Sequence, residues 1–395
     1  MPKSRSGPGQ RMISRRVAAL PASPIRRFFE LVQAMPDAIS LSIGEPDFVT
    51  PWHVREEAIF SLERGATHYT SNRGLPELRK QISQYLARRF GLEYDPETEI
   101  LATAGVSQGL DLALRVALDP GDVVIIPEPC YVSYAPCTTL AGGEHIFVST
   151  RPEDGFRLRA ESVAEAAGEG AKALLLGYPN NPTGAILDEA DLRAVAEAAK
   201  AADLLVISDE IYAELTYDRT HVSIAGLPGM RDRTIVLGGF SKGFAMTGWR
   251  LGWACAPGEI IEAMTRIHSY TMLSCSTMAQ RAAVEALRAG DSAVVEMREQ
   301  YNQRRRVLLK RFSEIGIPCP EPLGAFYAFP NISSSGLPDT EFAERLLNEQ
   351  RVAVVPGSAF GPSGAGHVRC SYATSLPQIE EALKRIAAFL DSLAS

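Results

Sequence analysis

The sequence predicts an α/β fold in which a large domain, with a mainly parallel sheet between helices, precedes a smaller α+β domain. Short apolar runs alternate with helical patterns from Glu99 to Pro257. These runs are apolar throughout instead of alternating with polar residues, which is typical of strands covered on both faces. After about Gly290 the order changes to one long charged helix followed by mixed short strands and helices. The chain is therefore expected to form two domains.

The predicted strands of the large domain are the apolar runs Ile100–Ala104, Val123–Ile126, His145–Val148, Ala173–Leu176, Leu204–Ser208, Thr234–Gly238 and Gly252–Ala256. Between two of them, Asp188–Ala202 has apolar residues at helical spacing, and charged residues occupy the opposite face. A turn at Asp119–Asp122, built on Pro and Gly, separates a helix from the next strand. The pattern thus predicts repeated strand–helix units.

The smaller domain is predicted from four later segments. A charged helix runs from Asp291 to about Ile315, and a second one covers Thr340–Glu349. Strands follow at Val352–Val355 and His367–Tyr372, and a last helix begins at Leu376. We therefore expect an N-terminal arm of residues 1–45 that packs on the small domain, a large domain of residues 46–290 and a small domain of residues 291–395.

Composition excludes several classes of protein. The 395 residues hold 40 Lys and Arg against 47 Asp and Glu, a net charge of −7, which argues against nucleic acid as the main partner. No apolar run reaches the roughly 18 residues of a membrane span, and no secretory signal is recognisable. Six cysteines lie at irregular spacing without a CxxC pair, so neither zinc nor a redox dithiol is indicated, and no metal is predicted. Reduced thiols favour a cytoplasmic location.

Polar residues gather after the predicted strands, where the ligands of open α/β sheets bind. Gly105, Val106 and Ser107 form a small-residue turn that opens a helix, a place suited to a phosphate. Asp209 ends a buried strand, and a buried carboxylate needs a cationic partner. Lys242 stands among apolar and small residues, and a desolvated lysine is a nucleophile. Together these groups are the set that pyridoxal phosphate (PLP) requires.

The ordered motifs resemble those of the class I/II, fold-type I PLP-dependent aminotransferases, the group that includes aspartate and aromatic aminotransferases. The likeness covers nearly the whole chain, and its motifs in order are Gly44–Phe48, His68–Thr70 with Gly74–Leu75, Asn180–Gly184, Ser208–Tyr212, Ser241–Lys242 with Met246–Arg250, and Val368–Arg369. No single motif suffices, but their order and spacing make the match specific.

The resemblance implies roles for particular residues at the cofactor. Lys242 would bind PLP covalently and then carry a proton between substrate and cofactor. Asp209 would hold the ring N–H, and Asn181 and Tyr212 would hydrogen-bond the phenolic oxygen. The residues implied to bind the phosphate are Ser241, Arg250, Gly105, Val106 and Ser107, and Tyr131 would stack on the ring.

The resemblance also implies contacts to substrate and to a second subunit. Arg369 would bind the α-carboxylate in a bidentate manner, and Gly44 would mark the strand that covers the substrate. Tyr69 resembles the residue that reaches the partner's phosphate, so a homodimer with shared active sites is expected. Relatives specialised for dicarboxylates add a second cation, but this chain has Ser107 in the phosphate turn. Among nearby residues, Asn72 and Arg73 are candidates for that role.

The favoured function is transfer of an amino group from an aromatic, aspartate or broad neutral L-amino acid to 2-oxoglutarate by a ping-pong mechanism. A C–S β-lyase of the same fold would use the same residues and would release pyruvate and ammonia without a 2-oxo acid. A cofactor-binding regulator is the third reading, but the sequence lacks the added DNA-binding domain of such regulators.

Overall fold

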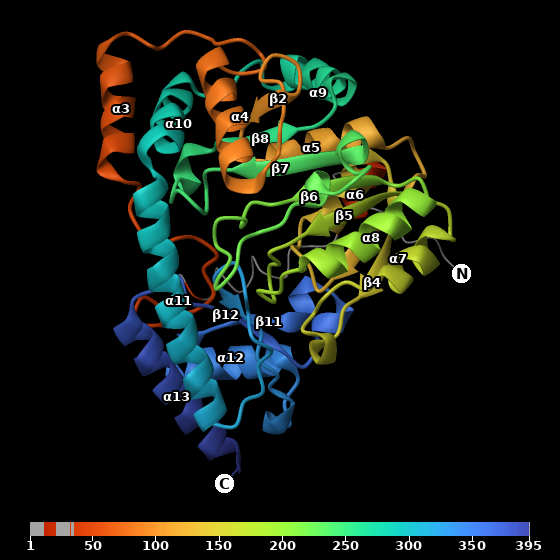
Figure 1. Cartoon of the computed structure of the whole chain (residues 1–395). Helices are drawn as coiled ribbons and strands as arrows, with labels where there is room; N and C mark the ends of the chain where they lie inside the picture. The colour runs from red at the N-terminus through yellow and green to blue at the C-terminus, as the bar shows by residue number, and fades with distance from the viewer. Residues whose placement is uncertain (1–11, 21–31, 33–34, 395) are drawn as a thin grey trace.

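The computed structural model describes residues 12–20, 32 and 35–394, and it places a seven-stranded sheet at the centre of the larger unit (Figure 1). The strand order is β2-β8-β7-β6-β5-β3-β4, and β8 runs antiparallel to both β2 and β7 while the other neighbours are parallel. The bounds are β2 Ile100–Thr103, β3 Val123–Glu128, β4 Glu144–Ser149, β5 Ala171–Gly177, β6 Leu205–Asp209, β7 Thr234–Gly239 and β8 Gly252–Cys255. The predicted fold class is confirmed.

Helices cover both faces of this sheet, which explains the continuous apolar runs. On β5, Leu174 packs into the cluster that contains helix α8, whereas Leu175 packs into the cluster of α5 on the other face. Asp188 caps α8 by accepting a hydrogen bond from the Asp191 amide at 2.9 Å. The helices of this unit are α3 Trp52–Glu63, α4 Pro76–Phe90, α5 Val106–Ala117, α6 Tyr134–Ala141, α7 Ala160–Ala167, α8 Glu189–Ala201, α9 Gly258–Thr271 and α10 Thr277–Ala289.

A long helix, α11 (Asp291–Glu314), leads from this unit to a smaller one that holds α12 (Asp339–Gln350) and α13 (Leu376–Ala394) (Figure 1). Its antiparallel sheet has the order β11-β12-β9, with bounds β9 Tyr327–Ala328, β11 Val355–Pro356 and β12 Val368–Ser371. The segment predicted as one strand over 352–355 is instead two, because β10 (Val352–Ala353) and β11 pair with different neighbours.

The N-terminal arm reaches the smaller unit through β1 (Ile39–Ser40), which pairs in parallel with β10. A short helix, α1 (Arg15–Ala18), lies against α6, where Arg16 donates to the Leu140 carbonyl at 2.9 Å. Residues 1–11, 21–31 and 33–34 of the predicted arm lie outside the described residues, and the domain limits at 45 and 290 stay predictions. Short 3-10 turns occupy Pro152–Asp154, Ile224–Gly226, Arg231–Arg233, Thr247–Trp249, Ser333–Ser335, Gly357–Phe360 and Pro362–Gly364.

Within the described part of the chain, no helix is both long enough and apolar enough to cross a membrane.

Candidate active site

A cavity of about 940 Å³ opens beside the ends of the central strands, and residues of the smaller unit complete its wall. Of the predicted site residues, those that line it are Gly44, Val106, Ser107, Tyr131, Asn181, Asp209, Tyr212, Ser241, Lys242, Arg250 and Arg369. Gly105 does not line the cavity itself but lies next to Arg250, which does. Tyr69 lies outside the cavity, with 82% of its surface exposed. The structure thus brings together side chains that are far apart in the sequence.

Lys242 follows β7 and carries the amine of the site. Its Nζ donates a hydrogen bond to the Gly44 carbonyl and lies 5.8 Å from the ring centre of Tyr212. Burial, together with the nearby positive charges of Arg369 and Arg250, lowers the pKa of Lys242 to about 8. A fraction of the amine is therefore neutral near pH 7 and able to attack a carbonyl carbon.

Asp209 is the last residue of β6 and lies buried at the floor of the cavity. Its Oδ2 accepts a hydrogen bond from the Tyr134 hydroxyl at 2.9 Å, and its Oδ1 accepts one from the Ile211 amide at 3.2 Å. Burial raises the pKa of Asp209 to about 6, although these two hydrogen bonds oppose the rise. The carboxylate of Asp209 is therefore mainly ionised at neutral pH, and it can accept a hydrogen bond from a ring N–H.

Sequence reasoning missed Tyr134. Its hydroxyl reaches Asp209 across a gap that exists because residue 177 is glycine: a Cβ there would lie 2.3 Å from the Tyr134 oxygen. A hydrogen bond donated to a buried carboxylate stabilises its ionised form. Tyr134 therefore helps to keep Asp209 charged.

The predicted phosphate-binding turn lies at the start of α5. Gly105 caps this helix with φ +77°, and a Cβ on it would come within 2.9 Å of Arg250 Nη2. The amides at the start of a helix and its dipole favour an anion. Arg250 itself adopts φ +53°, and its guanidinium lies next to Gly105. Ser107 and Ser241 line the same cavity as Arg250, and this set of donors fits a phosphate group.

Arg369, on β12, is 4% exposed. Its Nη1 donates to Asn181 Oδ1 at 2.9 Å and its Nη2 to the Ser42 carbonyl at 2.7 Å. The guanidinium carbon lies 4.4 Å from the ring centre of Tyr327 and 4.9 Å from that of Phe360. Among the described residues no Asp or Glu forms an ion pair with it, and its buried Nε has no partner. A buried guanidinium of this kind suits the carboxylate of a small ligand.

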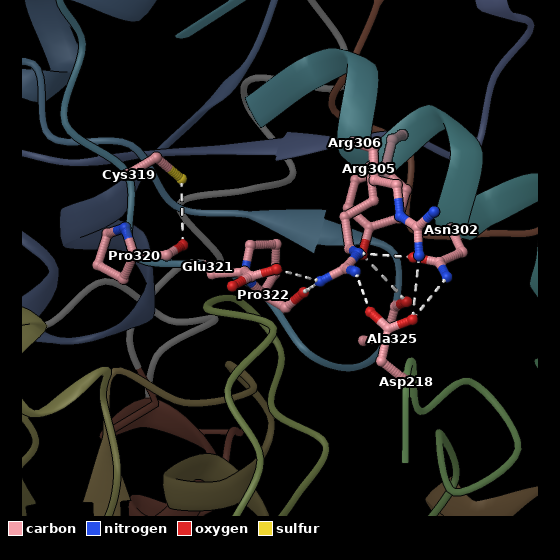
Figure 2. A network of polar contacts seen from close by, with 10 residues as sticks. Asp218, Asn302, Arg305, Arg306, Cys319, Pro320, Glu321, Pro322 and Ala325 are labelled. Atoms are coloured by element: carbon pink, nitrogen blue, oxygen red, sulfur yellow. Dashed lines mark hydrogen bonds and ion pairs between the residues drawn. The ribbon is translucent and has the colours of Figure 1, made fainter. Parts of the chain in front are cut away.

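The segment that carries Tyr212 is anchored on the smaller unit. Backbone hydrogen bonds join Leu215 to Ala325 at 2.8 Å and Tyr217 to Leu323 at 2.9 Å. Figure 2 shows the end of this segment, where Asp218 meets Arg305 of α11 with 2.6 Å between Oδ2 and Nη2. Arg305 also binds Glu321 and the Pro322 carbonyl (Figure 2). The position of Tyr212 therefore depends on both units.

Arg73, a candidate second cation for dicarboxylates, is engaged elsewhere. It pairs with Glu262 of α9 and donates to the Glu97 carbonyl at 2.7 Å, and it does not line the cavity. Asn72 does not line it either. Tyr327 lines the cavity and was missed by sequence reasoning, since nothing in its local pattern separates it from a core tyrosine.

Comparison with known proteins agrees with this geometry. Residues 36–386 match the family model described as aminotransferase class I and II. A putative aminotransferase of Bacillus subtilis (strain 168) is 51% identical over 95% of this chain and 97% of its own length. An aspartate aminotransferase of Pyrococcus abyssi is 47% identical over the same shares. The solved aromatic aminotransferase of Pyrococcus horikoshii superposes with a TM-score of 0.89 at 46% identity, over 92% of this chain and 99% of that one. The chain belongs to the class I and II aminotransferases and is a PLP-dependent aminotransferase of fold type I.

Proposed function

We propose that this aminotransferase takes its amino group from an aromatic or other neutral L-amino acid in preference to aspartate, and passes it to 2-oxoglutarate by a ping-pong mechanism. The observation that carries the donor preference is the set of charges in the cavity. Lys242, Arg250 and Arg369 are the cations among the described residues that line it. The first serves as the amine and the second adjoins the predicted phosphate-binding turn, so Arg369 is left for the α-carboxylate. Among the described residues that line the cavity, no further cation is left for the side-chain carboxylate of aspartate.

The walls around that space favour an apolar side chain. Tyr131, Pro179 and Ile211 line the cavity, and the Tyr131 ring packs edge-on against Tyr134 with centroids 5.6 Å apart. Aromatic substrates gain from such contacts, because burial of a ring and edge-to-face packing both contribute favourably.

Each residue around the cofactor site has its own role in the proposed reaction. PLP supplies an electron sink when bound. Arg369 would bind the α-carboxylate, and Asn181, whose Oδ1 accepts a hydrogen bond from Arg369, would donate from its amide N–H₂ to the cofactor's phenolic oxygen. Asp209 holds the ring N–H. Lys242 moves the proton from the substrate Cα, and its lowered pKa lets it accept that proton near neutral pH.

The donor preference is tested with the purified holoenzyme and single L-amino acids. The visible absorption band of the bound cofactor is followed after addition of phenylalanine, tyrosine, alanine or aspartate, without any 2-oxo acid. We expect phenylalanine and tyrosine to remove the band fastest and 2-oxoglutarate to restore it. A faster reaction with aspartate would reject the preference, and release of pyruvate and ammonia without a 2-oxo acid would reject amino transfer in favour of β-elimination.

The enzyme is further proposed to act as a homodimer whose sites are shared, with Tyr69 reaching the phosphate in the partner subunit. Its ring is 82% exposed, and the loop that holds it is tied to α10 by a hydrogen bond from Thr277 to the His68 carbonyl at 2.6 Å. Mixing Tyr69→Ala and Lys242→Ala chains tests the sharing. Random pairing should restore about a quarter of wild-type activity, because half of the pairs are mixed and each mixed pair has one intact site. A mixture no more active than its parents would contradict the shared site.

The pH dependence of cofactor capture follows from the amine of Lys242. Burial lowers its pKa to about 8, so protonated amine predominates below that pH and cannot attack the PLP aldehyde. In the apoprotein we expect the rate of covalent capture to rise about tenfold per pH unit up to pH 8 and to level off above it. Stopped-flow absorbance measures this rate, and Lys242→Ala serves as the blank. A rate still rising at pH 10, as for an exposed lysine, would contradict the depressed pKa.

A further inference from the structure

Tyr327 contacts both the carboxylate-binding arginine and the tyrosine at the cofactor. Its hydroxyl oxygen lies 2.8 Å from that of Tyr212, and its ring lies 4.4 Å from the guanidinium carbon of Arg369. The residue is 1% exposed, and its strand β9 pairs with β12, which carries Arg369. Its place is therefore fixed by the same small sheet that holds the arginine.

Glycine at position 44 makes the approach of this hydroxyl possible. A Cβ at Gly44 would lie 2.6 Å from the Tyr327 oxygen, closer than any two such atoms pack. The Gly44 carbonyl in turn accepts the hydrogen bond from Lys242. Gly44 was expected to mark a strand, but β1 ends at Ser40 and Gly44 lies in the irregular segment that follows it. The Tyr327 hydroxyl thus lies where this segment, Tyr212 and Arg369 converge.

The two hydroxyls have two protons for one mutual hydrogen bond, in which either oxygen can be the donor. Both tyrosines stay protonated at neutral pH, because burial raises the pKa of each. Among the described residues, Tyr212 is the hydrogen-bond partner of the Tyr327 hydroxyl. One proton is shared between the two oxygens, and the other is free. If Tyr327 donates, Tyr212 keeps its own proton for an acceptor in the cavity, and the donated bond makes it a better donor.

We propose that Tyr327 is a positioning residue with two separable actions. Its hydroxyl donates a hydrogen bond to Tyr212 and thereby directs the Tyr212 proton to the cofactor's phenolic oxygen. Its ring supports the Arg369 guanidinium. This inference rests on the proposed role of Tyr212. Tyr327 does not contact the reacting atoms, and it was not predicted from the sequence. This one side chain connects the binding of the substrate carboxylate to the pKa of the bound cofactor.

The hydroxyl is tested by the pH titration of the absorption band of bound PLP. Hydrogen bonds donated to the phenolic oxygen stabilise its anion and lower the pH midpoint of that band. Tyr327→Phe removes only the hydroxyl, so we expect the midpoint to rise by about half a pH unit, against about one pH unit for Tyr212→Phe. In the Tyr212→Phe background, Tyr327→Phe should add nothing, because it acts through Tyr212.

The ring is tested by the Michaelis constant of the amino donor. Tyr327→Phe keeps the ring, so KM should stay within about twofold, whereas Tyr327→Leu removes the cation–π contact and should raise KM about fivefold or more. Tyr372→Phe is the matched control, because it deletes a buried hydroxyl of the same core cluster, one that donates to the Ala325 carbonyl at 3.3 Å. It should change neither the midpoint nor KM.

The outcomes separate the inference from its premise. An unchanged midpoint in Tyr212→Phe would overturn the proposed role of Tyr212 and the inference with it. A raised midpoint in Tyr212→Phe together with a wild-type midpoint in Tyr327→Phe would overturn the inference alone. Equal changes in Tyr327→Phe and Tyr372→Phe would also overturn it, because they would show a general effect of losing a core hydroxyl.

Discussion

Replacing Lys242 with alanine is expected to lower turnover by at least about 10⁴-fold while PLP still binds. Two losses combine, since the same amine is proposed to capture the cofactor and to carry the substrate proton, and a positioned general base alone contributes about 10² to 10⁴. Binding persists because the predicted phosphate-binding residues Gly105 and Arg250 and the carboxylate of Asp209 are untouched. Absorbance after desalting reports the retained cofactor, and a half-reaction with a single amino acid reports the chemistry.

Lys310→Ala is the matched control, because this lysine of α11 is 78% exposed and forms a loose ion pair with Glu314 at 3.8 Å. It should leave the rate unchanged. If Lys242→Ala kept more than about one percent of wild-type turnover, the amine of Lys242 would have neither of the two proposed roles. A variant that retains no PLP would show instead that the covalent bond supplies most of the cofactor affinity.

The fold was largely predictable because its strongest signal is local. Strands buried on both faces must be apolar at every position, and Leu174 and Leu175 illustrate this by packing on opposite sides of β5. The direction of a strand is not local. The sequence of Gly252–Cys255 is compatible with a strand parallel or antiparallel to β7. The direction of this strand depends on where the preceding loop returns the chain to the sheet. The division of residues 352–355 into two strands depended likewise on distant partners.

The candidate site divides in the same way. Lys242 and Asp209 stand next to strand ends, so an expectation about open α/β sheets was enough to single them out. Tyr134 and Tyr327 matter through contacts with residues 75 and 115 positions away in the chain, Asp209 and Tyr212 respectively. No local pattern carries that information, because a buried tyrosine in a helix or a strand is ordinary core. Contacts of this length become visible only when the chain is folded.

Arg369→Lys is expected to lower kcat/KM for amino acids by about 10²- to 10³-fold, mainly through KM, even though it keeps the positive charge. The guanidinium lies over the rings of Tyr327 and Phe360, and its two Nη atoms already reach Asn181 and Ser42. A lysine ammonium is a single point that cannot stack over these rings and reach these partners while also binding a carboxylate. Hydrogen bonds to charged groups are worth about 1.5–3 kcal/mol each, and the loss of one or two gives this range.

The contribution of the α-carboxylate to binding can be measured with a substrate that lacks this group. Because every amino acid presents the same carboxylate, the loss in Arg369→Lys should be equal for phenylalanine, tyrosine and aspartate. 2-Phenylethylamine, which has the phenylalanine side chain without the carboxylate, should react slowly with both enzymes and differ by no more than about twofold between them. Arg79→Lys is the control, since Arg79 is a buried arginine of α4 that pairs with Glu97 away from the cavity. Equal losses on amine and amino acid would mean that Arg369 shapes the cavity as a whole, and the carboxylate would then have to be bound elsewhere.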